Sequence, residues 1–92
     1  GTIVIMEGAT VAQEAYLCTG THDFKDPSFQ LITKTIPVED NAFVGVRAMI
    51  MPGIKIGKNA IVGAQSVVTK NVKPNQIVAG QPAREIGLRK SK

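Results

Sequence analysis

Residues 38–68 read VEDNAFVGVRAMIMPGIKIGKNAIVGAQSVV, and a bulky aliphatic residue returns at every sixth position of this stretch. A helix brings apolar residues back after three and four positions and a strand alternates by two, so neither produces this period. A period of six is typical of short strands joined by regular corners, stacked into a solenoid. The aliphatic series is Val38, Val44, Ile50, Ile56, Val62 and Val68, and the small or apolar residues two places before them are Ile36, Ala42, Ala48, Ile54, Ala60 and Ser66.

The same frame runs through the N-terminal part of the chain, where Ile5, Val11 and Leu17 take the aliphatic position. It then slips, because Leu17 and Ile32 are 15 residues apart, which predicts one ordinary repeat followed by an inserted loop. The Lys73-Pro74-Asn75 triplet breaks the frame again. We predict one domain over residues 1–92, with coils at 1–22 and 32–73, the loop at 23–31, and a segment at 74–92 laid back across the last coil.

Glycine and asparagine are frequent in the triplets between the aliphatic and small positions, as in Pro52-Gly53 and Lys58-Asn59. Tight corners need positive φ angles, which these residues adopt at least cost. The small residue after each triplet fits the narrow interior of a triangular prism. The first residues, Ile3 and Ile5, are already in the pattern without a polar cap, so we expect an N-terminally truncated solenoid of about three coils.

The composition narrows the classes of partner. The chain carries a formal charge of +4, and Arg84, Arg89, Lys90 and Lys92 form a basic tail that is either a solvated terminus or a surface for a phosphorylated ligand. Basic and aromatic residues are not interleaved, so we expect no nucleic acid partner. No apolar run reaches about 18 residues, so we expect no membrane insertion and a cytoplasmic location. Cys18 is the sole cysteine, which excludes an internal disulfide.

Several motifs together resemble the hexapeptide-repeat acyltransferases. They are the repeats from Val44 to Val72, the Thr19-Gly20-Thr21-His22 sequence before the insertion, and the Ala79-Gly80-Gln81-Pro82-Ala83-Arg84 tail. The stretch 16–23 is most similar to the acetyltransferases of polysaccharide assembly, such as the colanic acid type. This resemblance implies an all-β, left-handed parallel β-helix. It also implies a homotrimer with active sites between subunits, acetyl-coenzyme A as donor, a small-molecule sugar hydroxyl as acceptor, and no metal.

His22 is the only histidine and stands directly before the insertion. Function is often grafted onto such loops of a rigid scaffold, and an imidazole that titrates near neutral pH suits proton transfer. The resemblance makes His22 the general base that takes the proton of the acceptor hydroxyl. It also implies that the backbone N–H of Val46 stabilises the oxyanion. The inserted loop, with Asp23, Phe24 and Phe29, is expected to shape the acceptor site, and packing of Phe24 and Phe29 against the neighbouring subunit is an equal alternative.

Further positions match those that contact the donor in the family. Phe43 would form a flat wall beside the donor or acceptor, or it would simply pack between subunits. Gly63 and Ala64 would let the pantetheine arm lie against the prism, while Thr69, Lys70 and Arg84 would bind the coenzyme, with Arg84 on phosphate. Relatives often carry a second basic residue where this chain has Gly87, so we expect either weaker phosphate binding or its replacement by Arg89 or Lys90.

Other functions on this fold are less compatible with the residues. A catalytically inactive module for trimerisation or ligand binding stays open as the alternative, because acceptor-binding residues of the family lie partly in coils that precede Ile3. A zinc carbonic anhydrase needs three histidines around the metal, and an ice-binding helix needs ranks of threonine along one face, and neither pattern is present.

Overall fold

The structure is a computed structural model that describes residues 1–22, 25, 27–28 and 31–90. These residues form short β-strands, and none of them belongs to a helix long and apolar enough to cross a membrane. The strands are β1 (Ile3–Ile5), β2 (Thr10–Val11), β3 (Tyr16–Leu17), β4 (Gly20–His22), β5 (Leu31–Thr33), β6 (Ile36–Val38), β7 (Phe43–Val44), β8 (Met49–Ile50), β9 (Ile61–Val62), β10 (Val67–Val68), β11 (Gln76–Gly80) and β12 (Ala83–Leu88).

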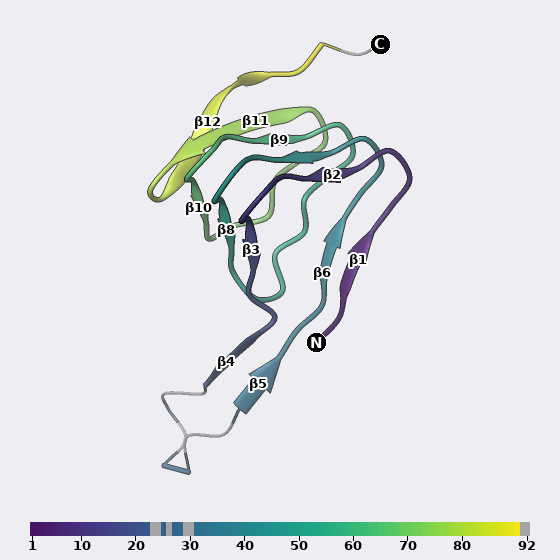
Figure 1. Cartoon of the computed structure of the whole chain (residues 1–92). Coiled ribbons are helices and arrows are strands. Elements are labelled where there is room, and N and C mark those ends of the chain that lie inside the picture. The colour runs from purple at the N-terminus through teal and green to yellow at the C-terminus, as the bar shows by residue number, and fades with distance from the viewer. Residues whose placement is uncertain (23–24, 26, 29–30, 91–92) are drawn as a thin grey trace.

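Apart from β4 and β5, the strands build three faces around one axis, and neighbouring strands within a face run parallel except at β12 (Figure 1). Face A pairs β1 with β6 and continues through single bridges at Ile56 and Val72. Face B has the order β2-β7-β9-β11-β12, and face C has the order β3-β8-β10. The chain visits A, B and C in turn and then starts the next turn, so each strand pairs with the equivalent strand of its neighbouring turn. This is the predicted left-handed parallel β-helix.

A projecting hairpin interrupts the first turn. Paired residues on the second and third turns are 18 residues apart, as in Val44 and Val62, whereas Val11 and Val44 are 33 apart. The additional residues form a ribbon in which β4 pairs antiparallel with β5 and leads away from the prism (Figure 1). The predicted loop at 23–31 is therefore too short, and Ile32 does not resume the coil, because its strand pairs with β4 instead. The coil resumes at Ile36, which is fully buried.

The last turn is shortened at the corner after Val68. Val72 pairs with Ile56, and Val78 pairs with Val62, so each partner lies 16 residues away instead of 18. The frame therefore shifts by two residues, and β11 adds another strand to face B. The chain then reverses at Gly80–Ala83, and β12 runs antiparallel to β11. The C-terminal segment thus extends face B before it folds back, with no helix between Ala83 and Lys90.

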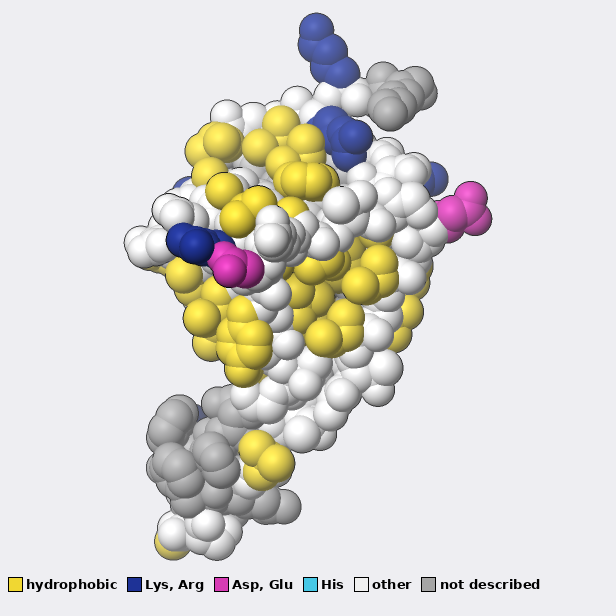
Figure 2. All heavy atoms as spheres, in the orientation of Figure 1, with side chains coloured by type: hydrophobic (Ala, Val, Ile, Leu, Met, Phe, Trp, Pro, Cys, Tyr) yellow, Lys and Arg dark blue, Asp and Glu magenta, His cyan; other side chains and the backbone are white. Residues whose placement is uncertain are grey.

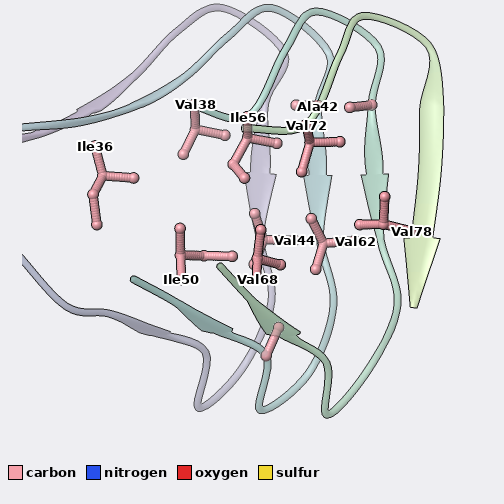
Figure 3. Packing of buried hydrophobic residues seen from close by; sticks show 12 residues of the cluster. Ile36, Val38, Ala42, Val44, Ile50, Ile56, Val62, Val68, Val72 and Val78 are labelled. Atoms are coloured by element: carbon pink, nitrogen blue, oxygen red, sulfur yellow. The ribbon is translucent and has the colours of Figure 1, made fainter. Parts of the chain in front are cut away.

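Inward side chains stack in columns along the axis (Figure 3). On face A the column is Ile5, Val38, Ile56 and Val72; the last three are buried, whereas Ile5 is 51% exposed on the outermost turn. Most of the small or apolar positions are buried as predicted, whereas Ile54, like Ala9 and Ala15 on the first turn, is only partly buried. The buried Ser66 hydroxyl accepts a hydrogen bond from the Gly80 N–H at 3.2 Å. Because each strand contributes only one or two inward residues, burial depends on the turns above and below.

The corners between faces A and B carry the expected asparagines. Asn41, Asn59 and Asn75 have φ angles of 59°, 61° and 65°, and Gly8 has a φ of 74° at the equivalent place. Backbone hydrogen bonds link successive corners, because the Asn59 N–H donates to the Asp40 carbonyl at 2.9 Å. The corners between faces B and C have positive φ at residues that do not favour it. These are Glu14, Arg47 and Gln65, with φ of 58–60°.

Gly57 stands where two turns approach closely, which allows a direct test of the packing. A Cβ at this position would lie 2.7 Å from both Pro74 N and Val72 O. We expect Gly57→Ala to lower the free energy of unfolding by about 1–3 kcal/mol, because the backbone of the next turn must shift. Thermal or urea unfolding measures this. Gly87→Ala is the matched control, since its added Cβ would meet only the end of Ile77 at 3.9 Å; an equal loss in both variants would contradict the explanation.

Candidate functional site

The hairpin presents His22 at the end of its first strand. The β4–β5 ribbon pairs Gly20 with Thr33 and ends with His22 opposite Leu31. The backbone of His22 therefore lies on the part of the chain that leaves the prism (Figure 1). The predicted acceptor-binding residues Asp23, Phe24 and Phe29 lie outside the described residues, as does the side chain of His22. The catalytic role of His22 and the acceptor site stay predictions.

Val46 lies at the corner between faces B and C, and it belongs to a ladder of stacked corners. The Arg47 N–H donates to the Gln13 carbonyl of the preceding turn at 3.2 Å, and the Gln65 N–H donates to the Val46 carbonyl at 2.8 Å. The Val46 N–H itself has no hydrogen-bond partner among the described residues, and neither has the N–H of Ala64 on the next turn. Successive corners thus offer backbone donors in a row along the prism.

The ladder continues to the turn that joins β11 and β12. The Gln81 side-chain amide donates to the Gln65 carbonyl at 2.7 Å, so this turn stacks on the corner of Gly63 and Ala64. A Cβ at Gly63 would lie 3.1 Å from the Cβ of Ala79, so this corner is closely packed. We name the corners 12–14, 45–47, 63–65 and 80–82 the corner ladder. Its residues Val46, Gly63 and Ala64 are three of the predicted site residues.

A cavity of about 230 Å³ lies at the C-terminal end of the prism. Its floor is apolar and includes Val68, Val72 and Val78, which belong to the ends of the inward columns. Three cationic side chains line it, namely Lys70, Lys73 and Arg84, together with Glu85. Glu85 accepts a hydrogen bond from the Gln76 side-chain amide at 2.9 Å. We call this the basic end cavity. Lys70 and Arg84, which the sequence predicted to bind the coenzyme together, both line it.

Electrostatically, the basic end cavity suits an anionic group. Lys70 and Arg84 are exposed, and one guanidinium N–H of Arg84 donates to the carbonyl of Ala83 at 3.0 Å. An arginine has five N–H donors, so the remaining ones can bind phosphate oxygens. Thr69 precedes Lys70 and is also exposed. Dark-blue basic side chains stand beside this end of the molecule in Figure 2, near the C-terminus.

Phe43 and Arg89 lie in a different place from the other predicted donor residues. Both line a second groove, of about 430 Å³, on the side of the corners between faces A and B. Arg89 Nη1 donates to the carbonyl of Asn41 at 2.8 Å. The expectation that Arg89 would replace the basic residue missing at Gly87 is therefore wrong, because this contact holds its guanidinium away from Arg84.

Two residues near the site were not foreseen. Glu85 enters the basic end cavity, and Gln81 bonds to the corner ladder. Both positions follow from the hairpin of β11 and β12, whose turn at 80–83 sets which residues oppose each other. Reading Gly80-Gln81-Pro82-Ala83 as a hairpin turn would have found them. Among the residues with described positions, no three His, Cys, Asp or Glu side chains gather where they could hold a metal ion.

Comparison with known proteins agrees with the repeat and the fold. Residues 38–70 match the bacterial transferase hexapeptide family (six repeats). The chain belongs to the hexapeptide-repeat transferases. This hexapeptide-repeat protein is 32% identical over 83 residues to the Escherichia coli (strain K12) protein WcaF, which is predicted to be a colanic acid biosynthesis acetyltransferase; the match covers 90% of the chain and 46% of WcaF.

Two other comparisons bear on the activity. A chloramphenicol acetyltransferase of Klebsiella aerogenes is 45% identical over 62 residues, which are 67% of this chain and 29% of that enzyme. The structure of a galactoside acetyltransferase in complex with coenzyme A superposes with a TM-score of 0.85 at 29% identity, over 94% of this chain and 44% of that one. This hexapeptide-repeat protein therefore spans less than half the length of each of these relatives.

Proposed function

We propose that the protein is an O-acetyltransferase that moves an acetyl group from acetyl-coenzyme A to a hydroxyl of a sugar or polysaccharide precursor. The observation that carries this proposal is the corner ladder, whose unpaired amides at Val46 and Ala64 lead toward the basic end cavity. A coenzyme A molecule has a matching sequence of groups, because a narrow thiol-bearing arm ends in a phosphorylated nucleotide. The named activities of the related acetyltransferases support the same reaction class.

The donor would lie along the axis of the prism. Neighbouring strands are about 4.8 Å apart, so the corners of Val46, Ala64 and Gln81 span about 10 Å. The pantetheine arm would contact the unpaired backbone amides of Val46 and Ala64 there. Its phosphates would reach Lys70, Thr69 and Arg84, which offer two cations and a hydroxyl. Charge-assisted hydrogen bonds of this kind are stronger than neutral ones.

The reaction would need a base and an oxyanion donor. His22 would accept the proton of the acceptor hydroxyl while the hydroxyl oxygen attacks the thioester carbonyl. The backbone N–H of Val46 would donate to the oxyanion of the tetrahedral intermediate. When the intermediate collapses, the C–S bond breaks, and the imidazolium returns the proton to the coenzyme A sulfur. The products are the acetyl ester and the free thiol, with no proton gained or lost.

We propose that the active form is a homotrimer with sites between subunits. The ribbon that ends at His22 leads away from the prism, so the ladder of a neighbouring copy is the natural partner for it (Figure 1). Tyr16 and Met49 stand side by side in register on face C and are 58% and 38% exposed, although both are large and apolar. Exposed apolar neighbours of this kind favour association. The acceptor would bind between the same two subunits.

An alternative is a catalytically inactive β-helix module that serves trimerisation or ligand binding. The observation that favours it is the coverage of the relatives, since the chain corresponds to less than half of each. Acceptor-binding residues of those proteins can lie in the part that has no counterpart here. The module would still bind coenzyme A through the corner ladder and the basic end cavity, or form trimers, without transferring acetyl groups.

Calorimetric titration with coenzyme A, together with light scattering, tests the proposed donor site. We expect binding at about micromolar Kd by a trimer, and at least a tenfold weaker Kd in the Lys70→Ala/Arg84→Ala double variant, since each charged hydrogen bond contributes about 1.5–3 kcal/mol. Lys55→Ala is the control, because its exposed side chain lines neither cavity. A folded trimer that binds no coenzyme A would overturn the proposal and leave only a structural role.

A further inference from the structure

The groove beside Phe43 has the features of an anion site of its own. We infer that it binds the phosphate group of a small phosphorylated sugar or nucleotide, independently of the coenzyme A site proposed above. It is larger than the basic end cavity, at about 430 Å³ against about 230 Å³. It is built from the first three corners between faces A and B and from the C-terminal tail. The groups that carry the inference are Lys58, Arg89, Asn41, Asn59, Thr10 and Phe43.

Arg89 is held in place from two directions. Its backbone N–H donates to the Asn75 carbonyl at 2.6 Å, and its Nη1 donates to the Asn41 carbonyl at 2.8 Å. The side chain therefore runs along the axis past the corner of Asn59, which lies between these two. Four of its five N–H donors remain for a ligand. A cation that is already ordered loses little conformational freedom when it binds an anion, which strengthens binding.

Charge and hydrogen-bonding groups in the groove favour a phosphate. Lys58 adds a second cation on the neighbouring corner, and Thr10, Asn41 and Asn59 add a hydroxyl and two amides. No carboxylate is among the described residues that line the groove. Glu7 and Asp40 precede Gly8 and Asn41 on the same corners but do not line it. Two cations with neutral donors around them suit a phosphate dianion better than a neutral sugar.

Phe43 indicates what the phosphate is attached to. Its side chain lies at the outward position of β7, next to Thr10, and is 40% exposed although it is large and apolar. An exposed aromatic ring beside polar donors can stack on the face of a sugar or of a nucleobase. The groove therefore combines a phosphate-binding end and an apolar wall. Both a sugar phosphate and a nucleotide present this combination, and the phosphate is the chemistry that they share.

The test is calorimetric titration of the whole chain with inorganic pyrophosphate, glucose 1-phosphate and uridine 5′-monophosphate. We expect at least one of them to bind, and Lys58→Gln and Lys58→Gln/Arg89→Gln each to raise its Kd about tenfold or more. Lys58 alone is informative because its side chain makes no hydrogen bond in the described part of the chain, so its loss should leave the fold intact. Phe43→Ala should weaken binding of glucose 1-phosphate and of uridine monophosphate and leave the Kd for pyrophosphate unchanged.

Matched variants separate this site from the proposed coenzyme A site. The Lys70→Gln/Arg84→Gln variant should bind coenzyme A more weakly and the three phosphates with unchanged Kd. The Lys58→Gln variant should bind the phosphates more weakly and coenzyme A with unchanged Kd. A tighter Kd for uridine monophosphate than for glucose 1-phosphate would identify a nucleotide, and the opposite order would identify a sugar phosphate. The inference is overturned if none of the three binds, or if the Lys70→Gln/Arg84→Gln variant loses phosphate binding while Lys58→Gln retains it.

Discussion

Replacing His22 by alanine is expected to slow acetyl transfer by about 10²–10⁴-fold while the affinity for coenzyme A stays nearly unchanged. The reason is that His22 is the proposed general base, whereas the proposed donor contacts lie on the corner ladder and in the basic end cavity. The change should lower kcat and kcat/KM together, because the base acts in the transition state. Release of the coenzyme A thiol measures the rate, with the best acceptor among a galactoside, chloramphenicol and a nucleotide sugar.

A neighbouring change on the same ribbon controls for the fold. Thr33→Ala lies on β5, in register with Gly20, and removes an exposed side chain. It should leave the rate within about twofold of the unchanged protein, since surface substitutions usually alter stability by less than about 0.5 kcal/mol. Full activity of the His22→Ala protein would show that another group takes the proton. Loss of coenzyme A affinity or of folding in that variant would likewise contradict the assigned role.

Replacing Ile56 by alanine is expected to lower the free energy of unfolding by about 2–5 kcal/mol. Ile56 is fully buried and stands between Val38 and Val72 in the column of face A, so its loss leaves a cavity between turns. Those turns carry the corner ladder and the basic end cavity. Equilibrium unfolding in urea measures the change, and we expect the midpoint to fall without a change in slope.

The same column supplies the control for this prediction. Ile5 occupies the equivalent inward position on the first turn and pairs with Val38, but it is 51% exposed. Ile5→Ala removes the same atoms from a site that water already reaches, so it should cost clearly less than Ile56→Ala. Equal losses at the two positions would mean that the turns do not depend on their neighbours for burial, contrary to the solenoid explanation.

The proposed donor site and the phosphate groove use different corners of the prism. The corner ladder runs between faces B and C, and the groove follows the corners between faces A and B. A prism with three edges can carry separate rows of backbone and side-chain groups, each repeated at the spacing of the strands. This geometry explains how a chain of 92 residues can offer two anion-binding places of different composition.

The fold class, most of the core and most corners could be predicted from the amino-acid sequence. The period of six is a local property, because a strand of two or three residues and a tight corner follow from the residues within each repeat. Val38, Val44, Ile50, Ile56, Val62 and Val68 are all buried as the period predicts. Asn41 and Asn59 take positive φ for the same local reason. His22, Lys70 and Arg84 could likewise be selected from motifs in the sequence.

The way in which the irregular segments connect to this frame could not be predicted in the same manner. The pairing of β4 with β5 removed Ile32 from the coil, and the short corner before Val72 shifted the frame so that β11 joined face B. Arg89 bonded to Asn41, 48 residues away, instead of joining Arg84. These outcomes depend on hydrogen bonds and packing between residues far apart in the chain. A period in the sequence reports which side chains point inward, but it carries no information about such distant partners.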